Sequence, residues 1–245
     1  IVDREQLTEP VNLAPGKTVT VSGTSDGNKD NVNDGDENTK WDSNFIKGNG
    51  ASENSWLCID LGGEKTSVFD EMTVRYFNKI YPTLMYIQIS NDAQNWTNIS
   101  ELTRDHNGAT PPVVTERFDA PYTARYLRLF FEELNSAAAG NGVGVKEWEI
   151  MGFALPGMSL KSVVQPEAVS KNLGSQLTAA ELPAFVKVVL TQSTAGDVET
   201  QVPVTWNLEG YNSGAAGTYT IRGNLDLPAS VAAANTAVTV DVTVG

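Results

Sequence analysis

The stretch Asn31-Val-Asn-Asp-Gly-Asp-Glu-Asn-Thr-Lys-Trp41 decides how the first half of the chain is interpreted. Around Gly35 it places four residues with oxygen-bearing side chains, Asp34, Asp36, Glu37 and Thr39. A hard cation such as Ca²⁺ binds about six to eight oxygens from carboxylates, hydroxyls and carbonyls, and glycine supplies the bend that turns carbonyls inward. The stretch therefore predicts a calcium loop. It lacks the EF-hand pattern, and a surface Asp-Gly turn without metal is the open alternative.

Length and composition indicate a two-domain β protein. The chain has 245 residues, enough for two domains that each bury a core. Gly, Thr, Asn and Val recur at short intervals, and no window has a long apolar repeat at helical spacing. No stretch approaches the length of a membrane-spanning helix. The chain starts at Ile1 without a methionine or signal peptide, so we expect an excised fragment of a larger precursor.

The charge balance argues against two classes of partner. The formal net charge is -13, which opposes binding to nucleic acid and to anionic lipid, because both recruit stripes of lysine and arginine. Cys58 is the only cysteine, so no intrachain disulfide forms. It stands in the apolar run from Trp56 to Leu61 and is expected to be a buried strand residue.

Alternating and β-prone runs place strands along the whole chain. In the first half we expect them at 12–22, 56–61, 70–77, 83–90, 115–118, 124–131 and 145–150. A boundary is expected near 152–157, where Pro156-Gly157 breaks the chain. After it, short β runs at 163–164, 185–190, 202–206, 218–222 and 238–244 alternate with turns, which predicts a small sandwich. The five tryptophans lie in or beside these strands and are predicted to be core residues.

Six ordered motifs carry a family resemblance. They are Asn12-Leu-Ala, Asp34-Gly-Asp-x-x-Thr-x-Trp41, Trp56-Leu-Cys-Ile-Asp-Leu-Gly62, Ile89-Ser-Asn-Asp-Ala-Gln-Asn-Trp96, Ala124-Arg-Tyr-Leu-Arg128 and Val145-Lys-Glu-Trp-Glu-Ile150. From Asn12 to Gly152 the chain resembles a coagulation factor V/VIII type C (discoidin) domain, and within that superfamily it is similar to the bacterial family 32 carbohydrate-binding modules. After the boundary, Leu182-Pro183, Val204-Thr-Trp206 and Gly217-Thr-Tyr-Thr-Ile-Arg-Gly223 resemble a bacterial Ig-like domain of group 4.

These resemblances imply an all-β architecture, an eight-stranded discoidin-like jelly-roll β-sandwich followed by a smaller Ig-like β-sandwich. The domains would be a lead-in at 1–11, the carbohydrate-binding F5/8 type C-like domain at 12–153 and the Ig-like domain at 158–245. The resemblance also implies a structural calcium that touches no sugar. Its ligands would be the Asn31 carbonyl, the Asp34 carboxylate, the Asp36 carbonyl, the Thr39 hydroxyl and carbonyl, the Lys146 carbonyl and the Glu147 carboxylate.

In family 32 modules the sugar sits on loops at one end of the sandwich, against an aromatic face and a few polar side chains. A pyranose offers an apolar face for stacking and hydroxyls for hydrogen bonds. The candidate stacking residues are Phe45 and Tyr81, and the candidate polar contacts are Asp26, Asn44, Asn78, Lys79, Arg104 and Asn141. Several galactose-binding members carry a histidine after the motif tryptophan, an arginine in the next loop and an aromatic residue late in the chain. This chain has Asp42-Ser43 and Asn78-Lys79 at the first two places and no aromatic residue at 135–144. Plain galactose recognition is therefore not implied, and a remodelled or absent sugar site is the open alternative.

The leading interpretation is a non-catalytic carbohydrate-binding module with an Ig-like spacer from a secreted or cell-surface bacterial glycoside hydrolase. It would direct the enzyme to host glycans that end in galactose or N-acetylhexosamine, and it would be a monomer outside the cell or attached to the wall. The alternative is an adhesion or protein-interaction module of a surface protein. Membrane lipid is disfavoured by the charge. Catalysis is also disfavoured, because the sequence has no Ser-His-Asp order, zinc motif or phosphate loop.

Overall fold

The first unit of the structure, a computed structural model, is a sandwich of two antiparallel β-sheets. The structure describes residues 9–22, 27–43, 55–78, 80–103, 112–134, 142–194 and 196–245. The strands of the first unit are β1 (Val11–Asn12), β2 (Thr18–Val21), β3 (Trp41–Asp42), β4 (Ser55–Asp60), β5 (Thr66–Tyr76), β6 (Pro82–Ser90), β7 (Thr97–Thr103), β8 (Val113–Thr123), β9 (Tyr126–Leu134) and β10 (Gly144–Leu155). A 3-10 helix, η2 (Lys29–Asn33), precedes β3.

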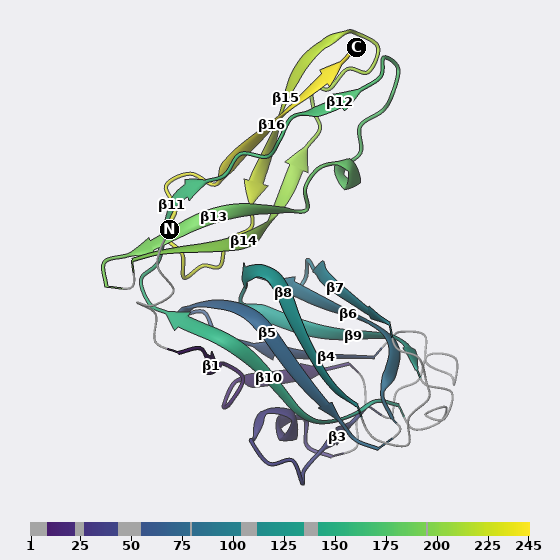
Figure 1. Cartoon of the computed structure of the whole chain (residues 1–245), viewed down its shortest axis with the longest axis vertical. Coiled ribbons are helices and arrows are strands. Elements are labelled where there is room, and N and C mark those ends of the chain that lie inside the picture. The colour runs from purple at the N-terminus through teal and green to yellow at the C-terminus, as the bar shows by residue number, and fades with distance from the viewer. Residues whose placement is uncertain are drawn as a thin grey trace.

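One sheet of this unit has the order β2-β4-β9-β6-β7. The facing sheet is formed by β10, β5 and β8, and the short strands β1 and β3 both pair with β10 (Figure 1). Eight of the described strands of this unit, β2 and β4 to β10, are longer than two residues. The predicted eight-stranded sandwich is therefore confirmed.

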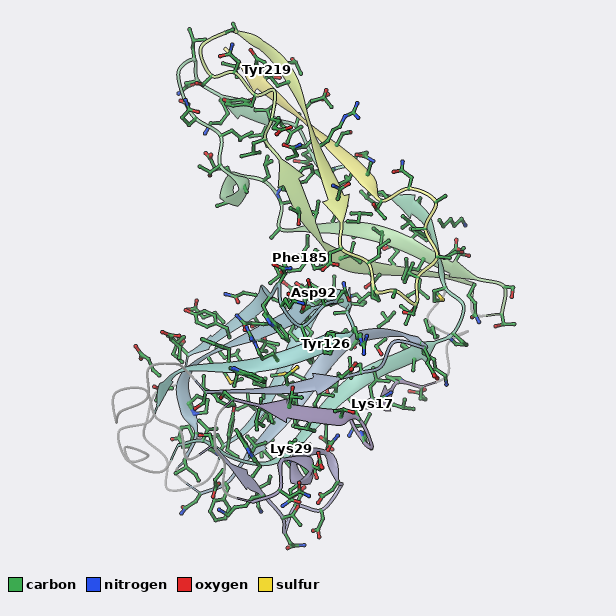
Figure 2. The ribbon with its side chains drawn as sticks, turned by 180° about the vertical axis from the view of Figure 1, so that it is seen from behind. Lys17, Lys29, Asp92, Tyr126, Phe185 and Tyr219 are labelled. Atoms are coloured by element: carbon green, nitrogen blue, oxygen red, sulfur yellow. The ribbon has the colours of Figure 1, made fainter. Side chains whose placement is uncertain are left out.

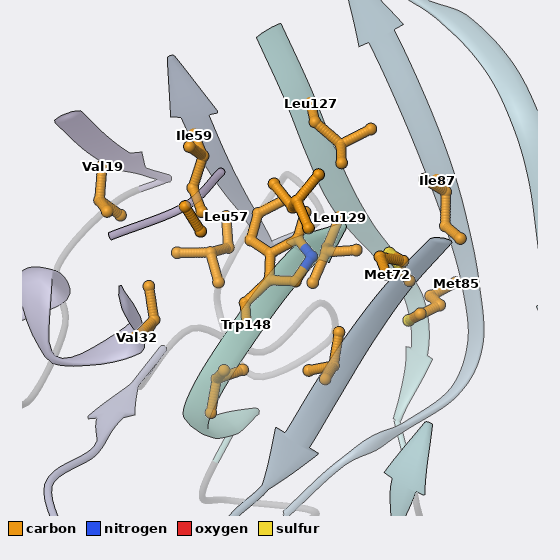
Figure 3. Packing of buried hydrophobic residues seen from close by; sticks show 14 of the residues in the cluster. Val19, Val32, Leu57, Ile59, Met72, Met85, Ile87, Leu127, Leu129 and Trp148 are labelled. Atoms are coloured by element: carbon orange, nitrogen blue, oxygen red, sulfur yellow. The ribbon is translucent and has the colours of Figure 1, made fainter. Parts of the chain in front are cut away.

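Large apolar side chains from both sheets fill the space between them. Trp148 of β10 is fully buried and lies among Leu57, Leu129 and Met72 (Figure 3). Alternation explains this core, since Leu57 and Ile59 of β4 face inward while Trp56 and Asp60 face outward. Cys58 is buried as predicted, at 3% exposure.

The tryptophan prediction is correct for three residues and wrong for two. Trp41 and Trp148 are fully buried, and Trp206 is 8% exposed in the core of the second unit. Trp56 and Trp96 are only partly buried and belong to neither core. The reason is register, because Trp56 occupies an outward position of β4, between core residues in the strand's alternation.

The second unit is a smaller sandwich. Its elements are β11 (Ser159–Val163), β12 (Val169–Lys171), η4 (Ala179–Glu181), β13 (Phe185–Gln192), β14 (Gly196–Asn207), β15 (Gly217–Leu225) and β16 (Ala237–Val244). β11, β13 and β14 form one layer, while β14 also continues into the layer β15-β16-β12. In β16 alternate residues are buried, from Val238 to Val244, as a half-buried strand requires. No helix in the described ranges is long and apolar enough to cross a membrane.

The two units meet along β8 and β14. Gln201 and Tyr122 pair in parallel, and the Tyr122 ring lies 5.1 Å from the Phe185 ring. Beside them Thr123 Oγ1 and Thr200 Oγ1 are 2.8 Å apart and buried. Val68 of the first unit belongs to the core of the second. The boundary at 156–157 therefore separates two sandwiches that share a buried, hydrogen-bonded junction.

This junction explains why β5 starts before its predicted position. Residues 66–69 are all buried, because the second unit covers the face that water would contact in an isolated sandwich. The alternation that marks a half-buried strand is lost there, so the sequence pattern placed the strand start at Asp70. The strands β7 and β12 were also missed.

Candidate functional site

The predicted calcium loop is a compact turn held by its own side chains. η2 begins after Asn28, whose side chain accepts a hydrogen bond from Asp30 N, and it ends at Asn33, directly before Asp34. Asp34 Oδ1 accepts from Asp36 N at 2.8 Å, and Asp34 Oδ2 accepts from Thr39 Oγ1 at 2.9 Å. Thr39 Oγ1 also lies 2.9 Å from the Asp36 carbonyl oxygen. Three predicted ligand groups therefore converge: the Asp34 carboxylate, the Asp36 carbonyl and the Thr39 hydroxyl.

The Asp36 side chain points to a different partner. Its Oδ1 accepts from the Asn38 backbone N at 2.9 Å and from Asn38 Nδ2 at 2.7 Å. These hydrogen bonds lower the pKa of Asp36. The Asp36 carboxylate therefore faces Asn38, while the Asp36 carbonyl faces Thr39 Oγ1.

A β-bulge in β10 brings the distant half of the site to the loop. The pairing of β10 with β5 shifts between Val145 and Glu147, so Lys146 is the extra residue of the bulge. Glu147 is 5% exposed, and its Oε1 accepts from Gly35 N at 2.8 Å. This hydrogen bond joins two segments that are 112 residues apart in the sequence.

Two carboxyl groups meet at this point. Burial raises the pKa of Glu147 to about 7, with further contributions from its hydrogen bond to Asp34 and from the Asp34 charge, while the Gly35 N–H acts in the opposite direction. The repulsion between two adjacent carboxylates is relieved by a proton or by a cation. The pairing of Asp34 with Glu147 therefore fits a bound cation.

Asn31, whose carbonyl is another predicted ligand, precedes the Asp34 turn. Asn31 lies in η2, and its side-chain Nδ2 donates to the Lys40 carbonyl at 2.9 Å, which ties the two ends of the loop together. Within the described ranges, no three His, Cys, Asp or Glu side chains gather in a metal-binding arrangement. A cation here would accordingly depend on two carboxylates together with carbonyl and hydroxyl oxygens, which are ligands that Ca²⁺ accepts.

Most of the predicted sugar contacts lie outside the described residues. These are Asp26, Asn44, Phe45, Lys79, Arg104 and Asn141. Asn78 is described, and it is exposed with a φ of 51°. Tyr81 is 4% exposed, and its ring centroid lies 6.3 Å from that of Tyr76 in the core. The stacking role predicted for Tyr81 does not fit this burial, because a core ring presents no open face to a sugar.

The structure adds three residues at the same end of the sandwich. Lys40 Nζ lies 4.3 Å from the centre of the Phe77 ring and forms an ion pair with Asp42. Asp42 is 7% exposed, and its Oδ1 has no hydrogen-bond partner among the described residues. Because Trp41 points into the core, its two neighbours must point to the opposite face. That alternation could have identified Lys40 and Asp42 from the sequence as candidate site residues on the face away from the core.

Backbone hydrogen bonds fix the framework of this end. Phe77 N donates to the Gly144 carbonyl at 2.8 Å, and Gly144 N donates to the Ile80 carbonyl at 2.8 Å. Ser43 N donates to Val143 O at 2.9 Å, and Val143 N donates to Ser43 Oγ at 2.8 Å. The described residues 40–43, 77–78, 80 and 143–144 are therefore held together. We call this group of residues the loop end.

Structural comparison finds several carbohydrate-binding modules of the same size as the first unit. One is chitosan-binding module 2, in complex with chitotriose, from a chitosanase/glucanase of Paenibacillus sp. IK-5, at 28% identity with a TM-score of 0.46, covering 57% of this chain and 98% of that one. Another is the family 32 module of Clostridium perfringens NanJ in complex with galactose, at 20% identity with a TM-score of 0.46, covering 58% and 98%. A comparison with curated proteins gives no significant match.

Family comparison covers both units. Residues 17–145 match the F5/8 type C domain, a segment that makes up more than half of the chain and contains the predicted calcium loop. Residues 166–228 match the bacterial Ig-like domain of group 4. The chain therefore belongs to the F5/8 type C domain family, and a bacterial Ig-like domain follows its F5/8 type C domain.

Proposed function

We propose that the chain is a non-catalytic glycan-binding module with an Ig-like spacer, whose sugar site is the loop end. The observation that carries this proposal is membership of the F5/8 type C family across residues 17–145. The loop end supports it by placing together an aromatic ring, a charged pair and an exposed amide, at Phe77, Lys40–Asp42 and Asn78. Polar groups beside an aromatic surface suit a pyranose.

The finer parts of the proposal concern ligand and context. We infer that the ligands are glycans that end in galactose or N-acetylhexosamine, and that the parent protein is a secreted or wall-attached glycoside hydrolase. A module of this kind raises the local concentration of an enzyme on its substrate, so weak binding at a single site is sufficient. The net charge of -13 disfavours anionic lipid as the target.

A mammalian glycan array tests the proposal, run with calcium and again with a chelator. We expect binding to a set that ends in galactose or hexosamine. Phe45→Ala is expected to weaken this binding, and so is Asn78→Gly, which removes an amide while keeping a residue that tolerates positive φ. The loss of one hydrogen bond predicts about fivefold weaker binding. Asn212→Gly in the second unit is the matched control. A blank array from folded protein, with a protein partner captured instead, would favour the adhesion alternative.

We also propose a structural calcium in the Asp34 loop, bound by oxygens of Asn31, Asp34, Asp36, Thr39, Lys146 and Glu147. Bound calcium would neutralise the Asp34 and Glu147 carboxylates and connect the first loop to β10. Calcium at a concentration one hundred times its Kd would stabilise the fold by about 2.7 kcal/mol.

Thermal unfolding measures that effect directly. Wild-type protein should unfold at a higher temperature in calcium chloride than in chelator, and Asp34→Ala should abolish the difference. Asp30→Ala removes an exposed acid of the preceding helix η2, which pairs with Lys29, and should keep the difference. Equal melting temperatures of the wild-type protein in both buffers would contradict the calcium proposal without affecting the glycan proposal.

A further inference from the structure

The outer face of the five-stranded sheet carries an ordered row of side chains from all five strands. Cross-strand register aligns Thr20 with Cys58, Cys58 with Arg128, Arg128 with Gln88, and Gln88 with Asn98. Figure 2 views the molecule from the side of this sheet, where no described strand or helix covers it. The outer face is therefore a surface distinct from the loop end.

Aromatic rings surround the arginine at the centre of the row. The Arg128 guanidinium carbon lies 3.8 Å from the centre of the Trp96 ring, 5.4 Å from that of Phe130 and 5.8 Å from that of Trp56. All three rings are partly exposed. A planar cation stacked on rings is held at a fixed tilt, because the stacking restricts rotation about its long side chain.

Two amides complete the orientation of this arginine. Arg128 Nε donates to Gln88 Oε1 at 2.7 Å, and Gln88 Nε2 donates to Asn98 Oδ1 at 2.7 Å. The bond at Nε leaves the Nη groups at the far edge of the guanidinium plane. That edge offers parallel N–H donors, which match the two oxygens of a carboxylate.

Arg128 lacks the carboxylate partner that three other described arginines have, and it shares this lack with the exposed Arg222. Arg75, Arg117 and Arg125 each lie within 3.5 Å of a carboxylate oxygen. Within the described part of this acidic chain, Arg128 has no such ion pair, although burial lowers its pKa to about 10. A partly desolvated cation without a counter-charge is costly, and a ligand carboxylate would offset that cost.

We propose that this face is a second binding surface, which takes a sugar bearing a carboxylate. The guanidinium edge of Arg128 binds the carboxylate, and the partly exposed rings of Trp56 and Phe130 stack against the apolar face of the pyranose. Gln88 and Asn98 are positioning residues that hold the guanidinium plane. A uronic acid and a sialic acid share the required chemistry. The surface does not depend on the loop end, so the two sites can be tested separately.

Titration of the full chain with trigalacturonic acid and with sialyllactose tests the proposal and distinguishes the two acid types, with lactose as the neutral probe. The indole N–H signals of Trp56 and Trp96 in NMR spectra report binding at this face. We expect at least one acidic probe to shift these signals, and added salt to weaken its binding, because the contact is an ion pair. Lactose should leave the signals unchanged.

Substitutions test whether the acidic probe binds at Arg128. Arg128→Gln should weaken binding of the acidic probe about tenfold or more. Gln88→Ala, which removes only the orienting amide, should weaken it by a smaller factor. Arg222→Gln is the matched control, because Arg222 is exposed on β15 of the second unit and its loss changes the net charge equally. Arg222→Gln should bind like the wild type.

Several results would overturn the proposal. One is a folded wild-type protein whose Trp56 and Trp96 signals respond to neither acidic probe at millimolar concentration. Another is tight binding of an acidic peptide together with no response to the sugars. If Arg128→Gln does not fold, unchanged affinity in Gln88→Ala is the deciding contrary result. Binding of neutral glycans at the loop end should survive in the Gln88 variant, so failure here is distinguishable from failure of the proposed function.

Discussion

The Asp92 carboxylate organises the turn between β6 and β7. Its Oδ1 accepts from the backbone N of Gln94 and of Asn95, each at 2.8 Å, and from Ser90 Oγ at 3.0 Å. Ala93 has a φ of 60° within this turn. The hydrogen bonds from Asn95 and Gln94 hold the pKa of Asp92 well below its usual value. The sequence predicted this turn, because aspartate commonly accepts such local bonds.

A pH-dependent loss of stability follows from that lowered pKa. The folded state favours the charged form, so the contribution is present above the unfolded pKa of about 4 and is lost as pH falls toward the folded value. Asp92→Ala should therefore reduce the urea midpoint at pH 7 more than at pH 2.5. Glu64→Ala, at an exposed turn position after β4, serves as the control. An equal reduction at both pH values would contradict the prediction.

At the scale of elements, β10 carries most of the site. It pairs with β1, β3 and β5, supplies Trp148 to the core, and contains the bulge that presents Glu147 to the predicted calcium loop. A second register shift falls between Met151 and Gly152. There a Cβ on Gly152 would lie 2.2 Å from the Val68 carbonyl oxygen and 2.8 Å from Phe69 Cα.

Gly152→Ala is accordingly expected to be strongly destabilising. The clash is with backbone of β5, which cannot rotate away as a flexible side chain does, so we expect a loss of about 1–3 kcal/mol or more in the free energy of unfolding. Gly214→Ala is the matched control, because its Cβ would meet only the Asn212 side chain, at 3.4 Å. Urea denaturation of both variants measures the difference. A Gly152→Ala protein as stable as the wild type would show that the two strands separate easily at this point.

At the scale of the whole molecule, the junction makes the two sandwiches one unit. Besides the pair of threonines, Thr66 Oγ1 lies 3.0 Å from Ser230 Oγ, and Asn91 Nδ2 donates to the Asp226 carbonyl at 3.0 Å. Aromatic contacts run from Phe118 through Tyr122 to Phe185. Polar groups that pair with each other across the buried junction avoid the cost of unpaired burial, and the apolar contacts beside them favour the closed arrangement.

We therefore expect a single cooperative unfolding transition for the full chain. Thr200→Val would leave the Thr123 hydroxyl and the Pro121 carbonyl without their partner, at a cost of about 1–3 kcal/mol. Calorimetry measures both expectations. Thr243→Val, which disrupts an exposed threonine pair at 3.4 Å, should be nearly neutral. Two separate transitions in the wild-type protein would show that the junction contributes little.

The sequence specified the local features of the site. The Asp34–Thr39 turn formed as predicted, because its oxygens and Gly35 lie within a few residues and satisfy each other locally. The sequence also indicated most strands, because one face of each is buried and the alternation of apolar and polar residues is clear. β7 (Thr97–Thr103) was missed, because this edge strand is mostly polar and none of its residues is fully buried, so it lacks the apolar signal on which such predictions depend.

The sequence by itself determined three features of this protein. Alternation of apolar and polar residues indicated the two sandwiches, local turn chemistry indicated the acidic loop, and the family motifs implied the predicted ligand set. Only the tertiary structure decided that Tyr81 is a core residue, that Trp56 and Trp96 face outward around Arg128, and that the second unit buries the start of β5. These outcomes depend on which distant strands pair and in which register, and register places each side chain inside or outside regardless of its own polarity.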